Sequence, residues 1–268
     1  MLGGGVLMER DAARESSGAL VMPAEEAVGV SIDNTKSNTE VSESPLRLGT
    51  EAFADECRRL DGRPLGYRFI KRAFDIAFST VIIAVGFIPC AILSIAIAAD
   101  TKGSPIYTQK RVGRLGRFFC IYKFRTMVAD ADDVEKYLDA KQLAQWKRER
   151  KVDNDPRITR LGSVLRKTSL DELPQFINVL KGQMSIIGPR VISCDELSNY
   201  SRTDIPVLLS VPQGITGPWQ AGPRNEANFE NGQRQAIELA YARHPTVGED
   251  LKVFFSTIET MFVERTGR

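Results

Sequence analysis

Residues 76–99 read IAFSTVIIAVGFIPCAILSIAIAA and contain no charged side chain. At about 1.5 Å per residue, a straight helix of this length reaches across a bilayer core of roughly 30 Å. A helix buried in a soluble core rarely stays apolar on every face for so long. The sequence therefore predicts a membrane helix over about residues 74–99.

The flanks of this run and its proline bear on how the helix sits in the membrane. Basic residues stand on both sides: Arg68, Lys71 and Arg72 before it, and Lys102, Lys110, Arg111, Arg114 and Arg117 after it. Positive flanks favour the cytoplasmic side, and Pro89 lacks a backbone donor and should kink the helix. A single span with a tolerated proline is one interpretation. We favour a re-entrant helix, because it keeps both basic flanks in the cytoplasm.

Residues 1–60 differ from the rest of the 268-residue chain in composition and charge. They are rich in Ser, Glu, Ala and Gly, lack a sustained apolar period, and hold eleven acidic against six basic residues. Since the whole chain carries +2, residues 61–268 carry about +7, which suits an anionic lipid surface or phosphate-bearing substrates. We expect a disordered tail over residues 1–60 and a membrane-anchored domain over residues 66–268.

The cysteines and the single histidine exclude several kinds of site. Cys57, Cys90, Cys120 and Cys194 are too far apart for a zinc knuckle or a CxxC redox motif. The only histidine, His244, lies in a polar stretch that favours a surface turn over a catalytic base. The basic residues form no stripe with interleaved aromatic side chains, so no nucleic-acid partner is expected.

After the membrane run, the pattern predicts a mostly helical α/β domain. Strands at 106–109 and 118–122, joined by a turn at 113–116, form a short β-hairpin, and helices are expected at 130–150, 157–167, 172–181 and 228–243. The last segment carries Val247, Leu251, Phe254, Phe255, Ile258 and Phe262 on one helical face. That face suits either the core or the membrane interface, and the sequence leaves both open.

Two adjacent carboxylates, Asp171 and Glu172, are the main candidates for chemistry. Pro174 fits best in the first turn of a helix, so both acids stand at or beside a helix start. There they could simply cap the helix, with Ser169 and Glu172 forming a capping box, and the spacing alone favours this interpretation. A carboxylate can also attack phosphorus to form an acyl phosphate, while its neighbour holds a divalent cation, usually magnesium.

Basic residues around the acid pair support the second interpretation. Arg166 and Lys167 precede the acids, Arg190 follows them in a Gly-Pro-Arg sequence, and Lys123 and Arg125 lie upstream. Arginine binds phosphate oxygens in bidentate pairs. Each signal is weak by itself, because most basic residues are solvated surface and Gly-Pro usually marks a turn.

Five motifs in order give the chain a family resemblance. They are KRAFDI at 71–76, KFRTM at 123–127, SLDELPQ at 169–175, GPR at 188–190 and GITG at 214–217. Over roughly residues 66–263 the chain resembles the bacterial sugar transferase family, the monotopic phosphoglycosyl transferases that initiate polysaccharide synthesis. Its length and the Trp219–Gln220 neighbourhood are most similar to exopolysaccharide-initiating members.

The resemblance implies a membrane-associated catalytic domain on the cytoplasmic face of the bacterial inner membrane, with a re-entrant helix broken at Pro89. It implies transfer of a sugar-1-phosphate from a UDP-sugar to undecaprenyl phosphate, the first step of exopolysaccharide repeat-unit assembly. Asp171 would attack the phosphate that bears the sugar, release UMP and pass the phosphosugar to undecaprenyl phosphate. Glu172 would help hold Mg²⁺, and further partners would be membrane lipid and downstream glycosyltransferases.

Under this resemblance, phosphate and nucleotide binding falls to Lys123, Arg125, Arg166, Pro189 and Arg190. The chain departs from the family pattern at Ile88, Val191, Pro212–Gln213 and His244–Pro245–Thr246. These departures put the detail of the helix break and the base or sugar preference in question, and galactose, glucose and N-acetylated sugars all remain open. The acid pair is intact, which argues against the alternative, a non-enzymatic membrane scaffold in a polysaccharide biosynthesis or export complex.

Overall fold

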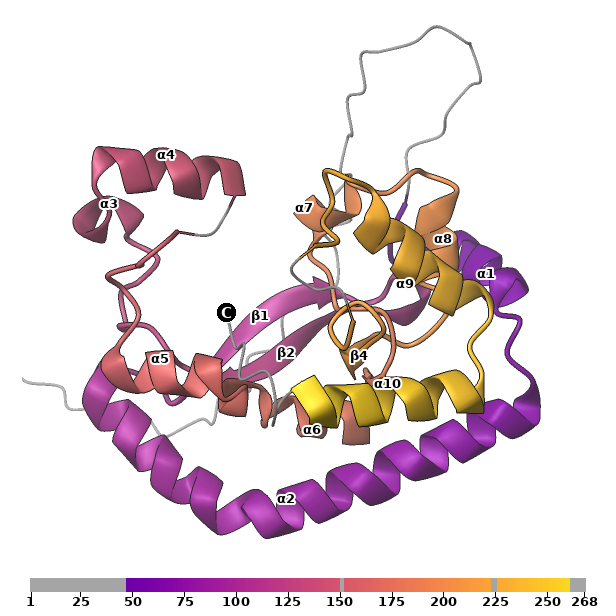
Figure 1. The fold of residues 1–268 in the computed structure, drawn as a ribbon, viewed down its shortest axis with the longest axis horizontal. Helices are drawn as coiled ribbons and strands as arrows, with labels where there is room; N and C mark the ends of the chain where they lie inside the picture. Colours follow the sequence, from indigo (N-terminus) through magenta and orange to yellow (C-terminus); the bar gives the residue numbers. More distant parts are fainter. Residues whose placement is uncertain (1–46, 150–151, 223–225, 261–268) are drawn as a thin grey trace, which may run out of the picture.

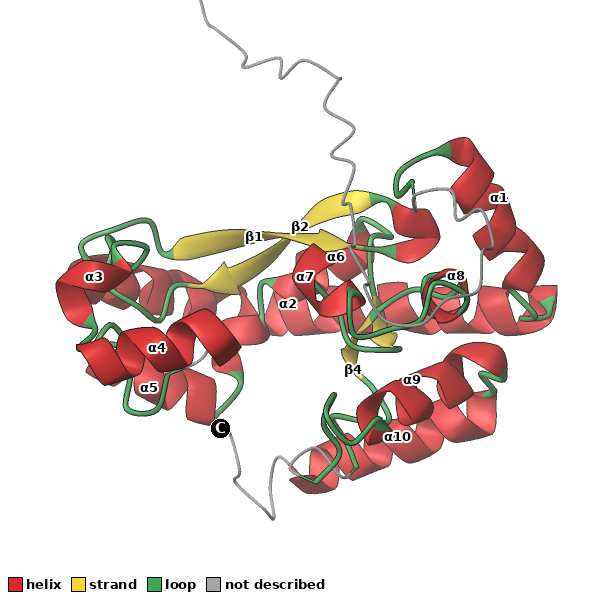
Figure 2. Cartoon of the chain, turned by 90° about the horizontal axis from the view of Figure 1, so that it is seen from above, coloured by secondary structure: helices red, strands yellow, loops and turns green. Residues whose placement is uncertain are grey.

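The structure, a computed structural model, describes residues 47–149, 152–222 and 226–260. Its helices and strands, with the 3-10 turns η1 and η2, are in order α1 (Glu51–Leu60), α2 (Leu65–Thr101), β1 (Ile106–Val112), η1 (Arg114–Gly116), β2 (Phe118–Phe124), α3 (Val134–Tyr137), α4 (Ala140–Glu149), α5 (Arg160–Lys167), η2 (Leu170–Glu172), α6 (Gln175–Leu180), β3 (Ser185–Ile187), α7 (Cys194–Leu197), α8 (Asp204–Leu208), β4 (Gly214–Thr216), α9 (Gln233–Arg243) and α10 (Val247–Glu259). The predicted mostly helical domain with a short hairpin is confirmed. The long α2 lies along one side of the other elements (Figures 1 and 2).

The predicted membrane helix is one continuous, bent helix. α2 contains Pro89, and Figure 1 shows a bend near its middle that turns both ends toward the rest of the protein. Pro89 has no amide to bond the carbonyl of Val85, and the hydroxyl of Ser94 donates to the carbonyl of Cys90 at 2.7 Å. Both features loosen the backbone ladder at this point. The helix is therefore kinked at the proline but not interrupted there.

The apolar side chains of α2 are largely uncovered by protein. Only 6% of its most apolar 18-residue window is buried, and by length and composition it is the one described helix that could cross a membrane. Val81, Val85, Phe87, Ile88, Ile92 and Ile95 each expose between 59% and 75% of their surface. Monomeric soluble proteins rarely expose so large a contiguous apolar surface. The exposure indicates membrane association.

A polar stripe fastens the first half of α2 to the domain. Tyr67, Lys71, Asp75 and Ser79 recur every four residues and are buried, so they lie on one face of the helix. The Asp75 carboxylate accepts a hydrogen bond from the backbone amide of Ile186 at 2.9 Å. Residues far apart in the sequence are thereby held together, and the opposite face of α2 is left uncovered by protein.

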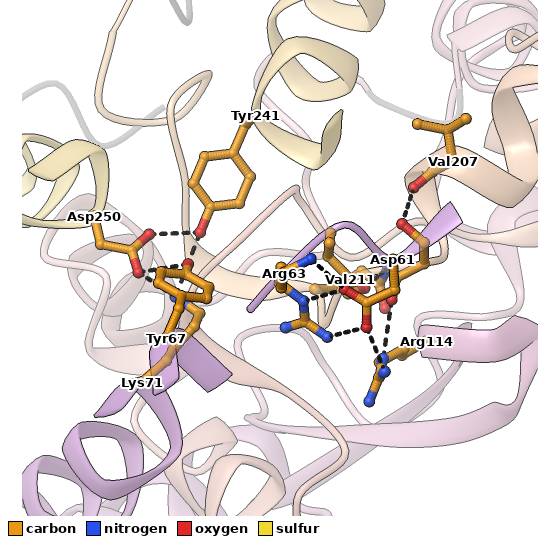
Figure 3. Close-up of polar contacts among 11 residues, drawn as sticks. Asp61, Arg63, Tyr67, Lys71, Arg114, Val207, Val211, Tyr241 and Asp250 are labelled. Atoms are coloured by element: carbon orange, nitrogen blue, oxygen red, sulfur yellow. Dashed lines mark hydrogen bonds and ion pairs between the residues drawn. The ribbon is translucent and has the colours of Figure 1, made fainter. Parts of the chain in front are cut away.

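Lys71 is the centre of a buried polar cluster that joins three helices (Figure 3). Its ammonium lies 2.8 Å from Oδ2 of Asp250 on α10. The hydroxyls of Tyr67 and of Tyr241, on α9, donate to the same carboxylate at 2.8 Å and 2.6 Å. All four residues are at most 9% exposed, so the charges of the pair are mutually compensated rather than solvated.

The segment before α2 corrects the predicted tail. α1 buries Phe53, Ala54 and Cys57, and Phe53 and Cys57 belong to the core cluster that includes Leu208 of α8. The ring of Phe53 packs on Gly116, where a β-carbon would lie 2.7 Å from it. The prediction of disorder to residue 60 is therefore wrong for α1. Its apolar face is too short to be recognised from the sequence, and it is identified only by the residues that pack on it. The rest of the predicted tail, residues 1–46, lies outside the described residues.

Phe53→Ala should lower the free energy of unfolding by about 3 kcal/mol, because it removes a buried ring and leaves a cavity against Gly116. Glu56→Ala, on the exposed side of the same helix, is the matched control and should change it by less than about 0.5 kcal/mol. Chemical denaturation of the detergent-solubilised chain measures both. Equal effects would mean that α1 is not part of the folded unit.

The predicted hairpin is confirmed and is longer than expected. β1 and β2 pair antiparallel from Ile106↔Phe124 to Val112↔Phe118. The side chain of Asn178, on α6, covers the free edge of β2: its Oδ1 accepts from the amide of Tyr122 at 3.0 Å and its Nδ2 donates to the carbonyl of Cys120 at 2.8 Å. Asn178 is fully buried. Its side chain satisfies backbone groups on an edge of β2 that has no strand partner there, and these bonds hold α6 against β2.

The expected helices occur with altered bounds. The segment 130–150 forms two helices, α3 and α4, and the segment 172–181 begins as the turn η2, with Pro174 between η2 and α6. α5 and α9 lie within the predicted ranges 157–167 and 228–243. The short parallel pair formed by β3 and β4, which joins Ser185 to Gly214 and Ile187 to Thr216, was not predicted.

The last helix has two different apolar faces. Val253 and Phe254 of α10 pack in a core cluster with Val179 and Tyr241. Val247, Leu251, Phe255 and Ile258 expose between 39% and 64% of their surface. Phe262 lies outside the described residues. Core packing is confirmed for Phe254, and the membrane-interface role stays a prediction for the exposed residues of α10.

Candidate active site

The acid pair lies in a tight turn between two helices. η2 holds Asp171 and Glu172, and it starts after Ser169, whose φ of 56° is in the left-handed region. Non-glycine residues adopt this conformation at a cost of about 1–3 kcal/mol, and such residues concentrate at functional sites. The turn contacts the end of α5 on one side and β2 on the other. It therefore sets both acids beside the basic residues of those elements.

Two of the predicted basic residues do lie at the acid pair. The ammonium of Lys123, at the end of β2, is 2.8 Å from Oε1 of Glu172. Arg166, in the last turn of α5, donates from Nε to the hydroxyl of Thr126 at 2.9 Å. Burial raises the pKa of the Asp171 carboxyl, and the positive charges of Lys123 and Arg166 oppose that rise. The structure thus assembles Asp171, Glu172, Lys123 and Arg166 in one group.

The environment of Asp171 favours its neutral form. Burial raises the pKa of its carboxyl, and the adjacent negative charge of Glu172 raises it further. Burial likewise lowers the pKa of the Arg166 guanidinium, while the charge of Asp171 raises it. A carboxylate that is costly to ionise and adjacent to cations is typical of a site with a chemical task.

The capping interpretation of the acids is not supported by the helix ends. Ser169 makes no side-chain cap for η2, and α6 begins after Pro174 without a side-chain cap. The expected Ser169–Glu172 capping box is therefore absent from this described segment, and Glu172 pairs with Lys123 instead.

Close backbone contact sets Arg166 at this site. α5 passes so near the end of β2 that a β-carbon on Gly162 would lie 2.0 Å from the carbonyl oxygen of Thr126. The same carbonyl accepts a hydrogen bond from the amide of Thr159 at 3.1 Å. Only glycine allows this approach, which puts Arg166 one turn later within reach of Thr126.

Gly162→Ala should therefore displace α5 and separate Arg166 from Thr126. We expect the free energy of unfolding, measured by chemical denaturation, to fall by about 1–3 kcal/mol. Gly248→Ala is the control, since a β-carbon on this helical glycine of α10 meets nothing within 4 Å. It should be neutral or slightly stabilising. An unchanged free energy of unfolding in Gly162→Ala would contradict the role of this contact.

Arg125 is held in a different group. Its Nε donates to the carbonyl of Ser104 at 2.7 Å, and its guanidinium lies 5.7 Å from the ring centre of Tyr107. These contacts tie the loop after α2 to the hairpin. In the structure Arg125 therefore holds the loop after α2 against β1, whereas the sequence analysis groups it with the phosphate-binding residues.

Pro189 and Arg190 lie where two glycine motifs cross. Pro189 is buried, and its carbonyl accepts from the amide of Gly214 at 2.8 Å. A β-carbon on Gly188 would lie 2.3 Å from the carbonyl of Pro212, and one on Gly214 would lie 2.2 Å from the amide of Gly188. The GPR and GITG motifs are thus in direct backbone contact, which fixes the loop that carries Arg190.

Aromatic stacking and a second arginine surround Arg190, and sequence reasoning missed most of these neighbours. Its guanidinium lies 5.7 Å from the ring centre of Trp219, and the guanidinium of Arg234 lies 4.2 Å from a ring centre of the same indole. Arg190 is also close enough to Arg111 to lower the pKa of that group, whose largest shift comes from burial. Arg111 had been noted only as a basic flank of the membrane run, so no local signal marked it.

No ready-made cation site accompanies the acid pair. Among the described residues, no group of three or more His, Cys, Asp or Glu side chains could hold a metal ion. Magnesium is usually bound through one or two carboxylates, with substrate phosphates and water completing the shell. Adjacent Asp171 and Glu172, both partly accessible, fit that donor set.

Residues 66–264 match the profile of the bacterial sugar transferases, and the chain belongs to that family. It is 36% identical over 234 residues to the exopolysaccharide production protein ExoY of Rhizobium meliloti, covering 86% of this chain and 98% of that protein. It is 41% identical over 197 residues to the undecaprenyl-phosphate galactose phosphotransferase of Salmonella typhimurium, covering 72% of this chain and 40% of that protein.

A third relative carries a different sugar in its name. The UDP-glucose:undecaprenyl-phosphate glucose-1-phosphate transferase of Escherichia coli is 36% identical over 203 residues, covering 74% of this chain and 41% of that protein. The chain thus spans about two fifths of the length of the Salmonella and Escherichia relatives and nearly all of ExoY. A relative named for galactose and one named for glucose match this chain at 41% and 36% identity, so these similarities do not single out one sugar.

Proposed function

We propose that this protein transfers a sugar-1-phosphate from a UDP-sugar to undecaprenyl phosphate in exopolysaccharide synthesis. The observation that carries the proposal is the partly buried acid pair beside Lys123 and Arg166, in a chain of the bacterial sugar transferase family. The names of its relatives supply the lipid carrier and the class of donor. The transfer runs through an aspartyl-phosphosugar intermediate.

In the first step an oxygen of Asp171 attacks the phosphorus that bears the sugar. The new bond is an acyl phosphate, the bond between the two phosphates breaks, and UMP leaves with the electron pair. In the second step a phosphate oxygen of undecaprenyl phosphate attacks the same phosphorus. The acyl phosphate bond then breaks, the Asp171 carboxylate is restored, and the sugar is left on a lipid diphosphate.

The surrounding side chains hold charge during both steps. Lys123 and Arg166 offset the negative charge that gathers at Asp171 and the reacting phosphate. Arg190, on the rigid loop beside Trp219, binds the nucleotide diphosphate. Glu172 would hold Mg²⁺ together with phosphate oxygens of the donor, and magnesium when bound supplies neutralisation of the diphosphate charge.

The membrane arrangement is part of the same proposal. α2 enters the cytoplasmic leaflet of the bacterial inner membrane and returns to the same side, with its kink at Pro89. Two observations support it: both ends of α2 turn toward the domain, and its polar stripe holds the first half against α9, α10 and β3 (Figure 1). This places the acid pair near the membrane surface, where a lipid phosphate arrives.

Labelling tests this topology. In a cysteine-free background, Glu56→Cys and Lys110→Cys, which flank α2, should both be protected from a membrane-impermeant thiol reagent in intact cells and both react after lysis. Residues 56 and 110 are both exposed, so the fold itself does not shield them from the reagent. Labelling of one flank in intact cells would show a helix that crosses the membrane.

The activity is tested with the purified full chain in detergent, undecaprenyl phosphate, Mg²⁺ and a panel of UDP-sugars. We expect UMP release with one donor preferred, and loss of release when EDTA removes the metal. The panel contains galactose, glucose and their N-acetylated forms. No UMP release from any donor, by the folded protein in detergent, would favour the scaffold function.

A further inference from the structure

A basic pocket lies between the end of α1, the first turns of α2 and η1. It is a cavity of about 320 Å³ lined by Arg58, Asp61, Arg68, Arg114 and Leu115. None of these residues has a place in the proposed reaction. Three guanidinium groups therefore face one carboxylate in a site with no assigned role.

The single carboxylate of the pocket is already engaged. Asp61 is 2.7 Å from Nε of Arg63 and 2.8 Å from Nη2 of Arg114, and its side chain is only 3% exposed (Figure 3). Arg114 also donates from Nε to the carbonyl of Ser210 at 2.9 Å. Asp61 thus fixes Arg114 in the pocket wall, and its charge is shared between two arginines.

The other two arginines are available to an anion. Arg58 pairs with Glu51 and Asp55 on the exposed side of α1, and exposed pairs of this kind contribute little, so they exchange readily. Within the described residues, no carboxylate lies within ion-pair distance of Arg68, which is exposed. The pKa of Arg114 is lowered, first by burial and then by the charge of Arg63, with Arg68 adding to it. The pocket carries an excess of positive charge.

An apolar rim adjoins this charge. Leu65 and Phe69, which flank Arg68 on the first turns of α2, expose 79% and 76% of their surface. A guanidinium between uncovered apolar side chains suits the boundary between acyl chains and head groups, where the apolar groups enter the lipid and the cation meets phosphate. A soluble anion would need the arginines but not this rim.

We propose that the pocket binds the phosphate of an anionic membrane lipid and so fixes the start of α2 at the membrane surface. Arg58, which lines one side of the pocket, lies on α1. This helix precedes residues 66–264, which the family profile matches. The inference goes beyond the transfer reaction and shares no residue with it. The inference requires only that Leu65 and Phe69, at the start of α2, reach lipid.

Binding is measured with the purified full chain in a neutral detergent, without nucleotide sugar, by following the thermal unfolding midpoint. The titrants are short-chain phosphatidylglycerol, short-chain phosphatidylcholine and inorganic phosphate. We expect phosphatidylglycerol to raise the midpoint in a saturable way, at concentrations at least tenfold below those at which either of the other two has an effect. Equal potency of inorganic phosphate or of phosphatidylcholine would overturn the lipid assignment.

Two variants and a control locate the site. Arg68→Gln should weaken the apparent affinity for phosphatidylglycerol at least tenfold, and Arg58→Gln at least threefold. Arg59→Gln removes the same charge from an exposed neighbour outside the pocket lining and should change the affinity less than twofold. Equal loss in all three variants would mean general attraction to anionic lipid and would overturn the pocket. UMP release in detergent by Arg68→Gln should stay within twofold of the parent, so this result is independent of the transfer reaction.

Discussion

Asp171→Asn should abolish UMP release, with a loss of at least about 10⁴-fold, and should leave no labelled phosphosugar on the protein. An amide has no anionic oxygen to attack phosphorus, so both the covalent intermediate and turnover disappear. The protein should still fold. Burial and the charge of Glu172 raise the pKa of Asp171, so its ionised form costs stability at neutral pH, and a neutral isostere removes that cost.

In Asp171→Asn, UMP release should therefore fall while thermal stability is kept or increased. We expect the thermal midpoint of Asp171→Asn, measured without divalent metal, to equal or exceed that of the parent protein. If the acid merely capped a helix, Asn would serve as well as Asp and activity would change little. Near-normal UMP release by a folded Asp171→Asn protein would thus remove the nucleophile from the mechanism.

Glu172→Gln provides the matched comparison at the neighbouring position. It removes the charge that pairs with Lys123 at 2.8 Å but leaves the attacking carboxylate in place. We expect most activity to be lost and part of it to return at higher Mg²⁺, because the weakened magnesium site is then refilled by mass action. Asp171→Asn should show no such recovery at any metal concentration.

Asp250→Asn should lower the free energy of unfolding by about 3–5 kcal/mol, because it leaves the ammonium of Lys71 buried without a counter-charge. The Asp250 carboxylate also accepts from Tyr67 and Tyr241, so the change weakens the junction of α2, α9 and α10 (Figure 3). Equilibrium chemical unfolding in detergent, followed by tryptophan fluorescence, measures the effect.

Asp204→Asn is the control for charge removal. Asp204 pairs with Arg243 at 2.9 Å, but the side chain of Arg243 is 52% exposed, so this pair is solvated. Its loss should cost less than about 1 kcal/mol. If Asp250→Asn costs no more than Asp204→Asn, the buried cluster does not hold α2 to the domain.

Several features were determined by the sequence because they depend on neighbouring residues alone. The uncharged run at 76–99 specifies an apolar helix, since no face of it carries a charged side chain. The strands of the hairpin and the kink at Pro89 follow from local backbone preferences. The acid pair was also visible, because adjacent residues in one short turn share one environment wherever the turn lies.

The tertiary structure alone decided which distant residues meet. Lys123 and Arg125 are two residues apart, yet Lys123 reaches Glu172 and Arg125 is bound at Ser104, because β2 ends between them and the chain turns. The sequence of α1 has the composition of a polar tail, and only the packing of Phe53 on Gly116 shows that α1 belongs to the folded domain. The stripe Tyr67–Lys71–Asp75 lay in the sequence at helical spacing, but its partners are more than a hundred residues away. Periodicity shows that a face is polar, whereas only the packed fold supplies the groups that satisfy it.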